Sequence, residues 1–157
     1  FFFKHTTAYE IPLRLVGSEM CIRDRAYTDN DELILCKRSI EPRHGYWTLP
    51  SGFLENQESI EEGALRETEE EAKLRVSNVK LFTVLSVPHI DQIYTFFTGK
   101  VVNYDFGPTP ESSEVKLFKY DDIPWDELAF PTVIKTIKLF LEHGDDKIIN
   151  EVLRPKI

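Results

Sequence analysis

The segment from Ser59 to Lys73 carries the strongest local signals in the chain, and these signals predict a helix with one buried side. The Ser59 side chain can accept a hydrogen bond from the backbone amide of Glu62, while the Glu62 side chain can reach back to Ser59, which makes a capping box. Residues suited to face a core follow at helical spacing: Ile60, Ala64, Leu65, Thr68 and Ala72. The chain must therefore supply a core for this helix to cover.

Strand-like segments rich in β-branched and aromatic residues lie on both sides of this helix. Residues 32–38 predict a strand that ends in two basic residues and is followed by a turn-rich loop. Residues 79–87 and 92–102 predict a hairpin with its loop at 88–91. The alternation over 114–120 predicts a further strand. Strands before and after a helix indicate one mixed α/β domain.

A second helix is predicted near the end of the chain. Pro131 suits the first turn of a helix, and Gly144 should end that helix. Its apolar face is expected to contain Val133, Ile134, Ile137 and either Phe140 or Leu141.

Length, composition and charge restrict what this domain can do. A chain of 157 residues can bury one core, and no run of 18 uncharged apolar residues indicates a membrane span. The net charge of −8 would repel phosphate-rich DNA or RNA, whereas a few arginines or a metal can still attract a small phosphorylated substrate. Cys21 and Cys36 are too few for a disulfide framework, which favours a cytoplasmic location. We expect neither a nucleic-acid nor a membrane partner.

Residues 1–25 differ from the rest of the chain. They show neither strand alternation nor a sustained helical period, and they lack the apolar stretch of a signal peptide. The part PLRLVGSEMCIRDR resembles a string found in translated sequencing reads that retained adapter sequence. We expect a non-native or disordered leader at 1–25, with a divergent leader or an extra strand as the alternative, and a functional domain at 26–157.

Eight glutamates lie between Glu55 and Glu71, and Glu67, Glu70 and Glu71 share one face of the predicted helix. Each like-charge pair costs about 0.2–0.5 kcal/mol, and the C-terminal half of the helix dipole adds to this penalty. A hard divalent cation would turn the repulsion into coordination. The alternative is a solvated acidic face, which spacing alone does not exclude. Arg66 lies four residues before Glu70 and can hold one carboxylate while the others remain free for metal.

The stretch from Gly52 to Leu74, GFLENQESIEEGALRETEEEAKL, resembles the Nudix box. That pattern has Gly, five residues, Glu, seven residues, Arg-Glu, an apolar residue, any residue, Glu-Glu, any residue, Gly and an apolar residue. The positions in register are Gly52, Glu58, Arg66, Glu67, Glu70, Glu71 and Leu74. Two positions depart from the pattern, because Thr68 takes the apolar site and Lys73 replaces the second glycine. Lys73 bears on the geometry of the helix end and not on the glutamates upstream.

The resemblance implies the α/β/α sandwich of the Nudix family, with a mixed β-sheet between helices. It also implies a site for Mg²⁺ or Mn²⁺ whose ligands are the Gly52 carbonyl, Glu67, Glu70 and Glu71. Glu58 would support this site, and Arg66 would orient the carboxylates. The implied reaction is attack of water on one phosphorus of a diphosphate, with the metal neutralising phosphate oxygens and lowering the pKa of the water.

Residues outside the box have expected roles that the sequence leaves more open. A helix glutamate or Glu114, in the loop before the late strand, could take the proton of the attacking water, and we favour Glu114 over Glu111. The family arrangement implies that Arg38 faces the substrate phosphates, against the alternative of an ordinary surface charge. Four aromatic residues could stack on a base, although an aromatic stripe is more often core: Tyr46, Trp47, Phe53 and Phe96.

The string CKRSIEPRHGYWTLPSGF is similar to that of Nudix enzymes that hydrolyse ADP-ribose or FAD. It implies a pyrophosphohydrolase that acts on a small nucleoside diphosphate linked to another group and releases AMP. One alternative is a pyrophosphatase that removes damaged nucleoside triphosphates. Another is a catalytically silent Nudix-like binding module, against which the intact Glu67, Glu70 and Glu71 argue. A homodimer is implied by the resemblance alone.

Overall fold

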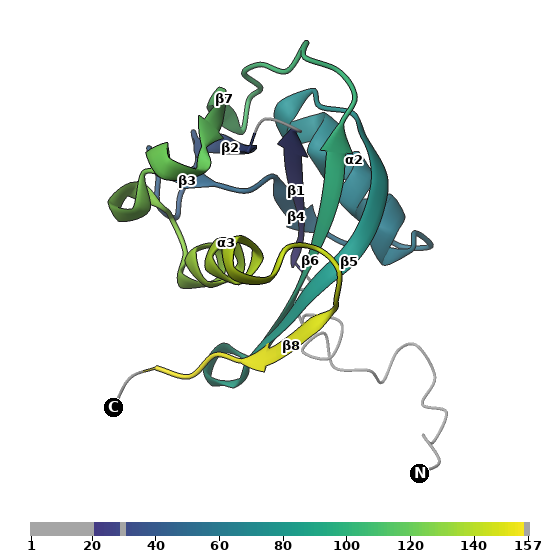
Figure 1. The fold of residues 1–157 in the computed structure, drawn as a ribbon, viewed down its shortest axis with the longest axis vertical. Helices are drawn as coiled ribbons and strands as arrows, with labels where there is room; N and C mark the ends of the chain where they lie inside the picture. Colours follow the sequence, from purple (N-terminus) through teal and green to yellow (C-terminus); the bar gives the residue numbers. More distant parts are fainter. Residues whose placement is uncertain (1–20, 29–30, 156–157) are drawn as a thin grey trace.

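The computed structural model describes residues 21–28 and 31–155, which form a mixed β-sheet and two α-helices (Figure 1). The strands are β1 (Cys21–Thr28), β2 (Glu32–Arg38), β3 (Trp47–Thr48), β4 (Ser51–Phe53), β5 (Val76–Val87), β6 (Gln92–Val101), β7 (Ser112–Lys119) and β8 (Ile149–Val152). The helices are α2 (Ile60–Ala72) and α3 (Pro131–His143). The strand order is β3-β2-β1-β6-β5-β8, with β4 beside β1 and β7 beside β2. β1–β6 and β5–β8 are parallel pairs and the other pairs are antiparallel, so the sheet is mixed as expected.

The residues of β2 show that the two helices cover opposite faces of the sheet. Leu33 belongs to the same core cluster as Val133 of α3, whereas Ile34 belongs to the cluster that contains Ala72 of α2. Successive residues of a strand point to opposite faces. The expected α/β/α sandwich is therefore confirmed.

The strands predicted from local patterns are present. The segment predicted at 32–38 is β2, and it is buried from Leu33 to Cys36. The predicted hairpin is the antiparallel pair of β5 and β6, joined through the short 3₁₀ helix Pro88–Ile90. The strand predicted at 114–120 is β7.

Both predicted helices are present with the expected caps. α3 begins at Pro131 and ends at Gly144, whose N–H donates to the Phe140 carbonyl at 2.8 Å. Of the two candidates for the last core position of α3, Phe140 is buried and Leu141 is exposed. No helix in the described ranges has the length and apolar composition that spanning a bilayer requires.

The apolar side predicted for α2 is correct except at Leu65. Ala64, Thr68 and Ala72 are buried, whereas Leu65 is 40% exposed. The buried side of α2 also includes Gly63, so its centre lies toward the small residues and away from Leu65. A helix face made of small residues allows the sheet to approach closely, and the larger leucine remains at the edge.

β1 crosses the boundary that we expected at residue 25. This strand pairs in parallel with β6 and antiparallel with β2 and β4, so residues 21–25 form part of the sheet. Backbone N–H and C=O groups form such pairs in almost any sequence, so the missing alternation of side chains did not exclude a strand. The expected boundary therefore falls inside β1, while residues 1–20 of the leader expected at 1–25 lie outside the described residues.

Candidate active site

The predicted capping box fixes the start of α2. The Glu62 backbone N–H donates to Ser59 Oγ at 3.2 Å, and the Ser59 N–H donates to Glu62 Oε2 at 2.7 Å. These bonds satisfy amide groups that a helix start leaves without intrahelical partners. They set the phase of the helix and thereby the direction in which its later glutamates point.

The backbone of β4 lies directly against the glutamate face of α2. A Cβ atom on Gly52 would lie 1.9 Å from Cδ of Glu67 and 2.0 to 2.1 Å from its carboxylate oxygens. One residue earlier, the Ser51 N–H donates to Glu71 Oε2 at 2.8 Å. The close approach at this point requires a residue without a side chain.

Arg66 gathers three glutamates. Its Nε and Nη2 donate to the two carboxylate oxygens of Glu58 at 3.0 and 2.7 Å. Its Nη1 donates to Glu67 at 2.6 Å and to Glu70 at 3.2 Å, and Nη2 also donates to the Phe53 carbonyl at 3.0 Å. All five N–H groups of the guanidinium therefore have acceptors. The arrangement can orient carboxylates, which is the role predicted for Arg66.

The carboxylates around Arg66 have different electrostatic surroundings. Hydrogen bonds, the strongest from Arg66, lower the pKa of Glu58. Burial raises the pKa of Glu67 despite the opposing effect of Arg66, and the charges of Glu70 and Glu111 raise that pKa further. Burial and negative neighbours both oppose the ionised form of Glu67, so a nearby cation would stabilise it.

Glu71 is the most enclosed glutamate of the face. It is 7% exposed, and Thr109 Oγ1 donates to its backbone carbonyl at 3.1 Å. Glu71 also affects the thiol of Cys36. Burial, and after it the negative charge of Glu71, raise the pKa of that thiol. Cys36 is accordingly a buried, protonated thiol of the core.

The structure brings the predicted metal ligands together only in part. Glu67 and Glu70 meet at Nη1 of Arg66, while Glu71 accepts from Ser51. In the part of the chain that the structure describes, no three His, Cys, Asp or Glu residues form a group that could hold a metal ion. The donor chemistry nevertheless fits a hard divalent cation, which prefers carboxylate oxygens. In this structure the positive charge among these carboxylates is the guanidinium of Arg66.

Glu111, rather than the favoured Glu114, is associated with the glutamate helix. Glu114 lies in β7 opposite Lys37, and the next residue, Val115, packs against the core under α2. Because neighbouring strand residues point to opposite faces, Glu114 points away from α2. Glu111 lies on the turn before β7, and its charge acts on Glu67. No sequence signal shows which of the two glutamates lies near the glutamates of α2, because this depends on which face of β7 points toward α2.

The aromatic residues proposed for base stacking differ in exposure. Trp47 is 5% exposed, and its ring packs edge-on against Phe118 with centroids 4.9 Å apart. Phe96 is fully buried. These two rings fill the core and are not open for stacking, which corrects the prediction for Trp47 and agrees, for Phe96, with the alternative that the aromatic stripe belongs to the core. Tyr46 and Phe53 are 36% and 54% exposed, so their rings are accessible.

Arg38 lies at the end of β2, beside the turn that carries Glu111. Its Nε donates to the Pro42 carbonyl at 2.8 Å, and its guanidinium lies 5.2 Å from the centroid of the Phe130 ring. The N–H of the next residue, Ser39, donates to the Glu111 carbonyl at 2.9 Å. The Arg38 guanidinium thus lies over a ring that packs against the α3-side core, while its backbone neighbour reaches the turn that carries Glu111.

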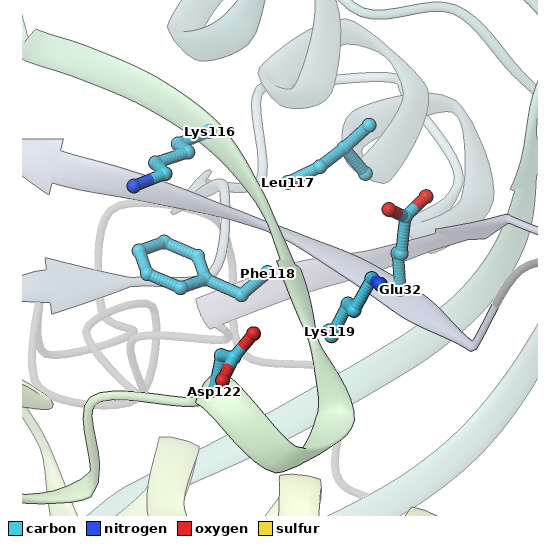
Figure 2. A pocket seen from close by; sticks show the side chains of 6 residues that line it. All are labelled: Glu32, Lys116, Leu117, Phe118, Lys119 and Asp122. Carbon is cyan, nitrogen blue, oxygen red and sulfur yellow. The ribbon is translucent and has the colours of Figure 1, made fainter.

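A surface pocket of about 410 Å³ lies apart from these glutamates (Figure 2). Its lining residues come from the start of β2, the end of β7 and the turn that follows: Glu32, Lys116, Leu117, Phe118, Lys119 and Asp122. These are the ends of β2 and β7 opposite to Arg38 and Glu111. The pocket therefore does not form the candidate site.

Comparison with known proteins gives matches to one family. The model of the NUDIX domain matches residues 24–140. The NAD-capped RNA hydrolase NudC of Salmonella heidelberg is 31% identical over 98 residues, an alignment that covers 60% of this chain and 37% of NudC. The chain thus aligns with well under half the length of this curated relative.

Solved structures agree with the family match. A NUDIX hydrolase from Nitrosomonas europaea has a TM-score of 0.82 and 39% identity, covering 87% of this chain and 79% of that chain. An ADP-ribose pyrophosphatase from Streptococcus suis has a TM-score of 0.70 and 20% identity, covering 87% of this chain and 100% of that chain. At 20% identity the second likeness shows the fold alone.

Proposed function

The chain belongs to the NUDIX family of hydrolases, and we propose that it is a metal-dependent pyrophosphohydrolase that cuts the diphosphate bond of a nucleoside diphosphate linked to another group. The observation that carries this proposal is the grouping of Glu58, Glu67 and Glu70 around Arg66, next to the bare backbone of Gly52. The side chains of Glu58 and Glu67 are only 15% and 13% exposed. Such enclosure argues against a merely solvated acidic face.

We infer that Mg²⁺ or Mn²⁺ is held by Glu67, Glu70 and Glu71, with the Gly52 carbonyl as a further ligand. The metal would neutralise phosphate oxygens and lower the pKa of the attacking water. The raised pKa of Glu67 supports this inference, because a cation would offset the burial that opposes its ionised form.

The residues of the chain itself would position the substrate and accept a proton. Arg66 holds Glu67 and Glu70 in place through its Nη1 group. Glu111 is the candidate acceptor for the proton of the attacking water, since its charge already acts on Glu67. Arg38 would neutralise a non-bridging phosphate oxygen of the substrate.

We propose ADP-ribose or FAD as the substrate, with AMP as one product. The similarity of the segment 36–53 to ADP-ribose and FAD hydrolases supports this choice. The match to NudC favours a second candidate, hydrolysis of the diphosphate of NAD or of an NAD-capped RNA. The net charge of −8 supports a small substrate over an RNA body.

The test is hydrolysis of a panel with and without Mg²⁺: ADP-ribose, FAD, NADH, a short NAD-capped RNA and 8-oxo-dGTP. We expect magnesium-dependent release of AMP from ADP-ribose, FAD or NADH, or release of nicotinamide mononucleotide from the NAD-capped RNA with a 5′-monophosphate left on the RNA. Either activity should fall by about 100-fold or more in Glu70→Gln. Glu69→Gln is the matched control, because Glu69 is an exposed neighbour on the same helix and should retain activity. Release of pyrophosphate from 8-oxo-dGTP alone would indicate the triphosphate-sanitising alternative. No turnover of any compound by a folded sample would indicate the silent binding module.

Three further expectations from the sequence carry over as part of this proposal. They are a homodimer, a cytoplasmic location and a non-native origin of the first residues. The buried free thiol of Cys36 supports a reducing compartment. Light scattering of the purified chain tests the homodimer.

A further inference from the structure

The end of β2 together with the loop that joins it to β3, residues 37–46 and here called the basic loop, concentrates positive charge in an acidic protein. It contains Lys37, Arg38 and Arg43 against the single carboxylate of Glu41, while the whole chain carries −8. None of the three cations takes part in an ion pair with a described residue. With 27 acidic residues in the chain, this lack of pairing leaves a basic surface that can attract an anion.

Aromatic rings lie beside these cations, although Glu114 also lies opposite Lys37 on the neighbouring strand β7. The Arg43 guanidinium lies 5.5 Å from the ring centroid of Tyr46, and Lys37 Nζ lies 5.4 Å from that of Trp47. A guanidinium beside a ring keeps the N–H groups at its edge available for an oxyanion. Because Arg43 is exposed and Tyr46 is 36% exposed, this pair can contact a ligand from solvent.

Backbone hydrogen bonds close this loop. The Arg38 N–H donates to the Tyr46 carbonyl at 2.9 Å, and the Gly45 N–H donates to the Arg38 carbonyl at 2.8 Å. The Tyr46 N–H donates to the Arg43 carbonyl at 3.1 Å. Arg43 itself has φ +64°, a left-handed conformation that costs a non-glycine residue about 1 kcal/mol. Such strain is often kept where a side chain serves a function, and here the side chain is an unpaired arginine.

The loop also lies next to the candidate active site. Ser39 binds the turn before β7 twice, through its N–H to the Glu111 carbonyl at 2.9 Å and through Oγ to the Pro110 carbonyl at 2.6 Å. The same turn reaches α2, because Thr109 Oγ1 donates to the Glu71 carbonyl at 3.1 Å. A substrate whose diphosphate lies at the glutamates can therefore extend across this turn toward the basic loop.

We propose that Arg43, with the Tyr46 ring beside it, binds a phosphate monoester that the substrate carries outside the cleaved diphosphate. The inference rests on the proposed function and specifies its substrate class, a dinucleotide or nucleotide conjugate with an additional phosphate on its ribose. Arg43 supplies charge-assisted hydrogen bonds to the phosphate oxygens. Tyr46 contributes a flat surface for the sugar or base beside that phosphate.

The test measures binding of three nucleotides to the full chain by calorimetry without added metal, so that no hydrolysis is needed. The probes are AMP, adenosine 2′,5′-bisphosphate and adenosine 3′,5′-bisphosphate. We expect one bisphosphate to bind about tenfold or more tightly than AMP, as one or two charge-assisted hydrogen bonds would give. The two bisphosphates distinguish which ribose hydroxyl carries the recognised phosphate.

Arg43→Gly is the decisive variant, because glycine adopts φ +64° without strain and the loop should keep its shape. We expect this variant to lose the preference for the bisphosphate, while Arg75→Ala, at an exposed arginine outside the loop, keeps it. Equal binding of all three nucleotides, or an unchanged preference in Arg43→Gly, would overturn the inference. A preference that depends on Arg43 in a chain that hydrolyses nothing would support the binding site and refute only the proposed reaction.

Discussion

At the scale of single residues, Gly52 determines how closely β4 can approach the glutamate helix. In Gly52→Ala the new Cβ would lie 1.9 Å from Cδ of Glu67, so the carboxylate has to move. The carboxylate is the end of a flexible side chain, and we therefore expect a stability cost of about 1 kcal/mol or less. The displaced ligand should nevertheless lower kcat/KM by about 100-fold. Kinetics together with urea unfolding measure the two effects separately.

Gly107→Ala is the matched control for this prediction. A Cβ on Gly107 would have no heavy atom within 4 Å, so the substitution should leave kcat/KM nearly unchanged. Equal losses of activity in the two variants, or full activity in Gly52→Ala, would show that the contact with Glu67 is not what matters.

Glu67 is expected to serve function at the expense of stability. Burial, before the charges of Glu70 and Glu111, raises its pKa above the ordinary value of 4.5. A raised pKa in the fold means that the unfolded chain releases this proton more readily. The stability that protonated Glu67 contributes is therefore fully present below about pH 4.5 and is lost as the pH rises through the pKa in the fold.

With metal removed by a chelator, we expect Glu67→Gln to unfold at a higher urea concentration than the unsubstituted chain at neutral pH. This difference in urea midpoint should shrink as the pH falls toward 4.5. The same variant should lose magnesium-dependent turnover. Urea midpoints measured between pH 4 and pH 8 test the sign, with Glu69→Gln, at an exposed position of the same helix, as the reference. An advantage that grows as the pH falls would contradict the assignment.

At the scale of elements, the end of α2 explains how the chain tolerates its departure from the motif. Lys73 takes the place of the motif glycine and adopts φ +55°, the left-handed conformation of a helix C-cap. Its N–H still donates to the carbonyls of Thr68 and Glu69, so the cap forms despite the side chain. We expect Lys73→Gly to stabilise the chain by about 0.5–1 kcal/mol, because glycine adopts this conformation without strain.

Urea unfolding tests this prediction, with Glu69→Gly as the contrasting variant. Glu69 lies inside α2, where glycine costs about 1 kcal/mol relative to a good helix former. Opposite signs are expected for two glycine substitutions only four residues apart. If both substitutions destabilise the chain, the Lys73 side chain stabilises the fold by more than the strain of its left-handed backbone costs.

The other departure, Thr68, is accommodated by a local hydrogen bond. Thr68 is fully buried at a position where the motif has an apolar residue, and its Oγ1 donates to the Ala64 carbonyl at 2.8 Å. A buried hydroxyl without such a bond would cost roughly 1–3 kcal/mol. The helix thus supplies the partner that its own side chain requires.

At the scale of the whole molecule, the choice between two loop glutamates depends on how the sheet and the turn before β7 are arranged. That turn is bound to the end of α2 through Thr109, and it brings the charge of Glu111 to Glu67. Glu114 lies on the opposite face of the sheet. If Glu111 accepts the proton, Glu111→Gln should lower kcat by about 100-fold and Glu114→Gln by far less. A larger loss in Glu114→Gln would restore the assignment first favoured from the sequence.

The sequence by itself determined the features that depend on neighbours along the chain. The Ser59–Glu62 capping box, the phase of the glutamates on α2 and the hairpin of β5 and β6 all arise from residues close in sequence. Such contacts are readable because helical and strand periodicity place nearby residues on one face. The motif within 52–74 likewise depends only on the spacing of residues close in sequence, and this spacing was sufficient to identify the family.

Only the tertiary structure decided the features that join distant segments. An extra strand near β1 was only an alternative in the sequence, and β8 was not predicted, because each is a strand through its pairing with β6 or β5, far away in the chain. The same holds for the contact of Gly52 with Glu67, the burial of Trp47 and the approach of Glu111. Pairing of distant backbones and packing of a core depend on surfaces that no local pattern records.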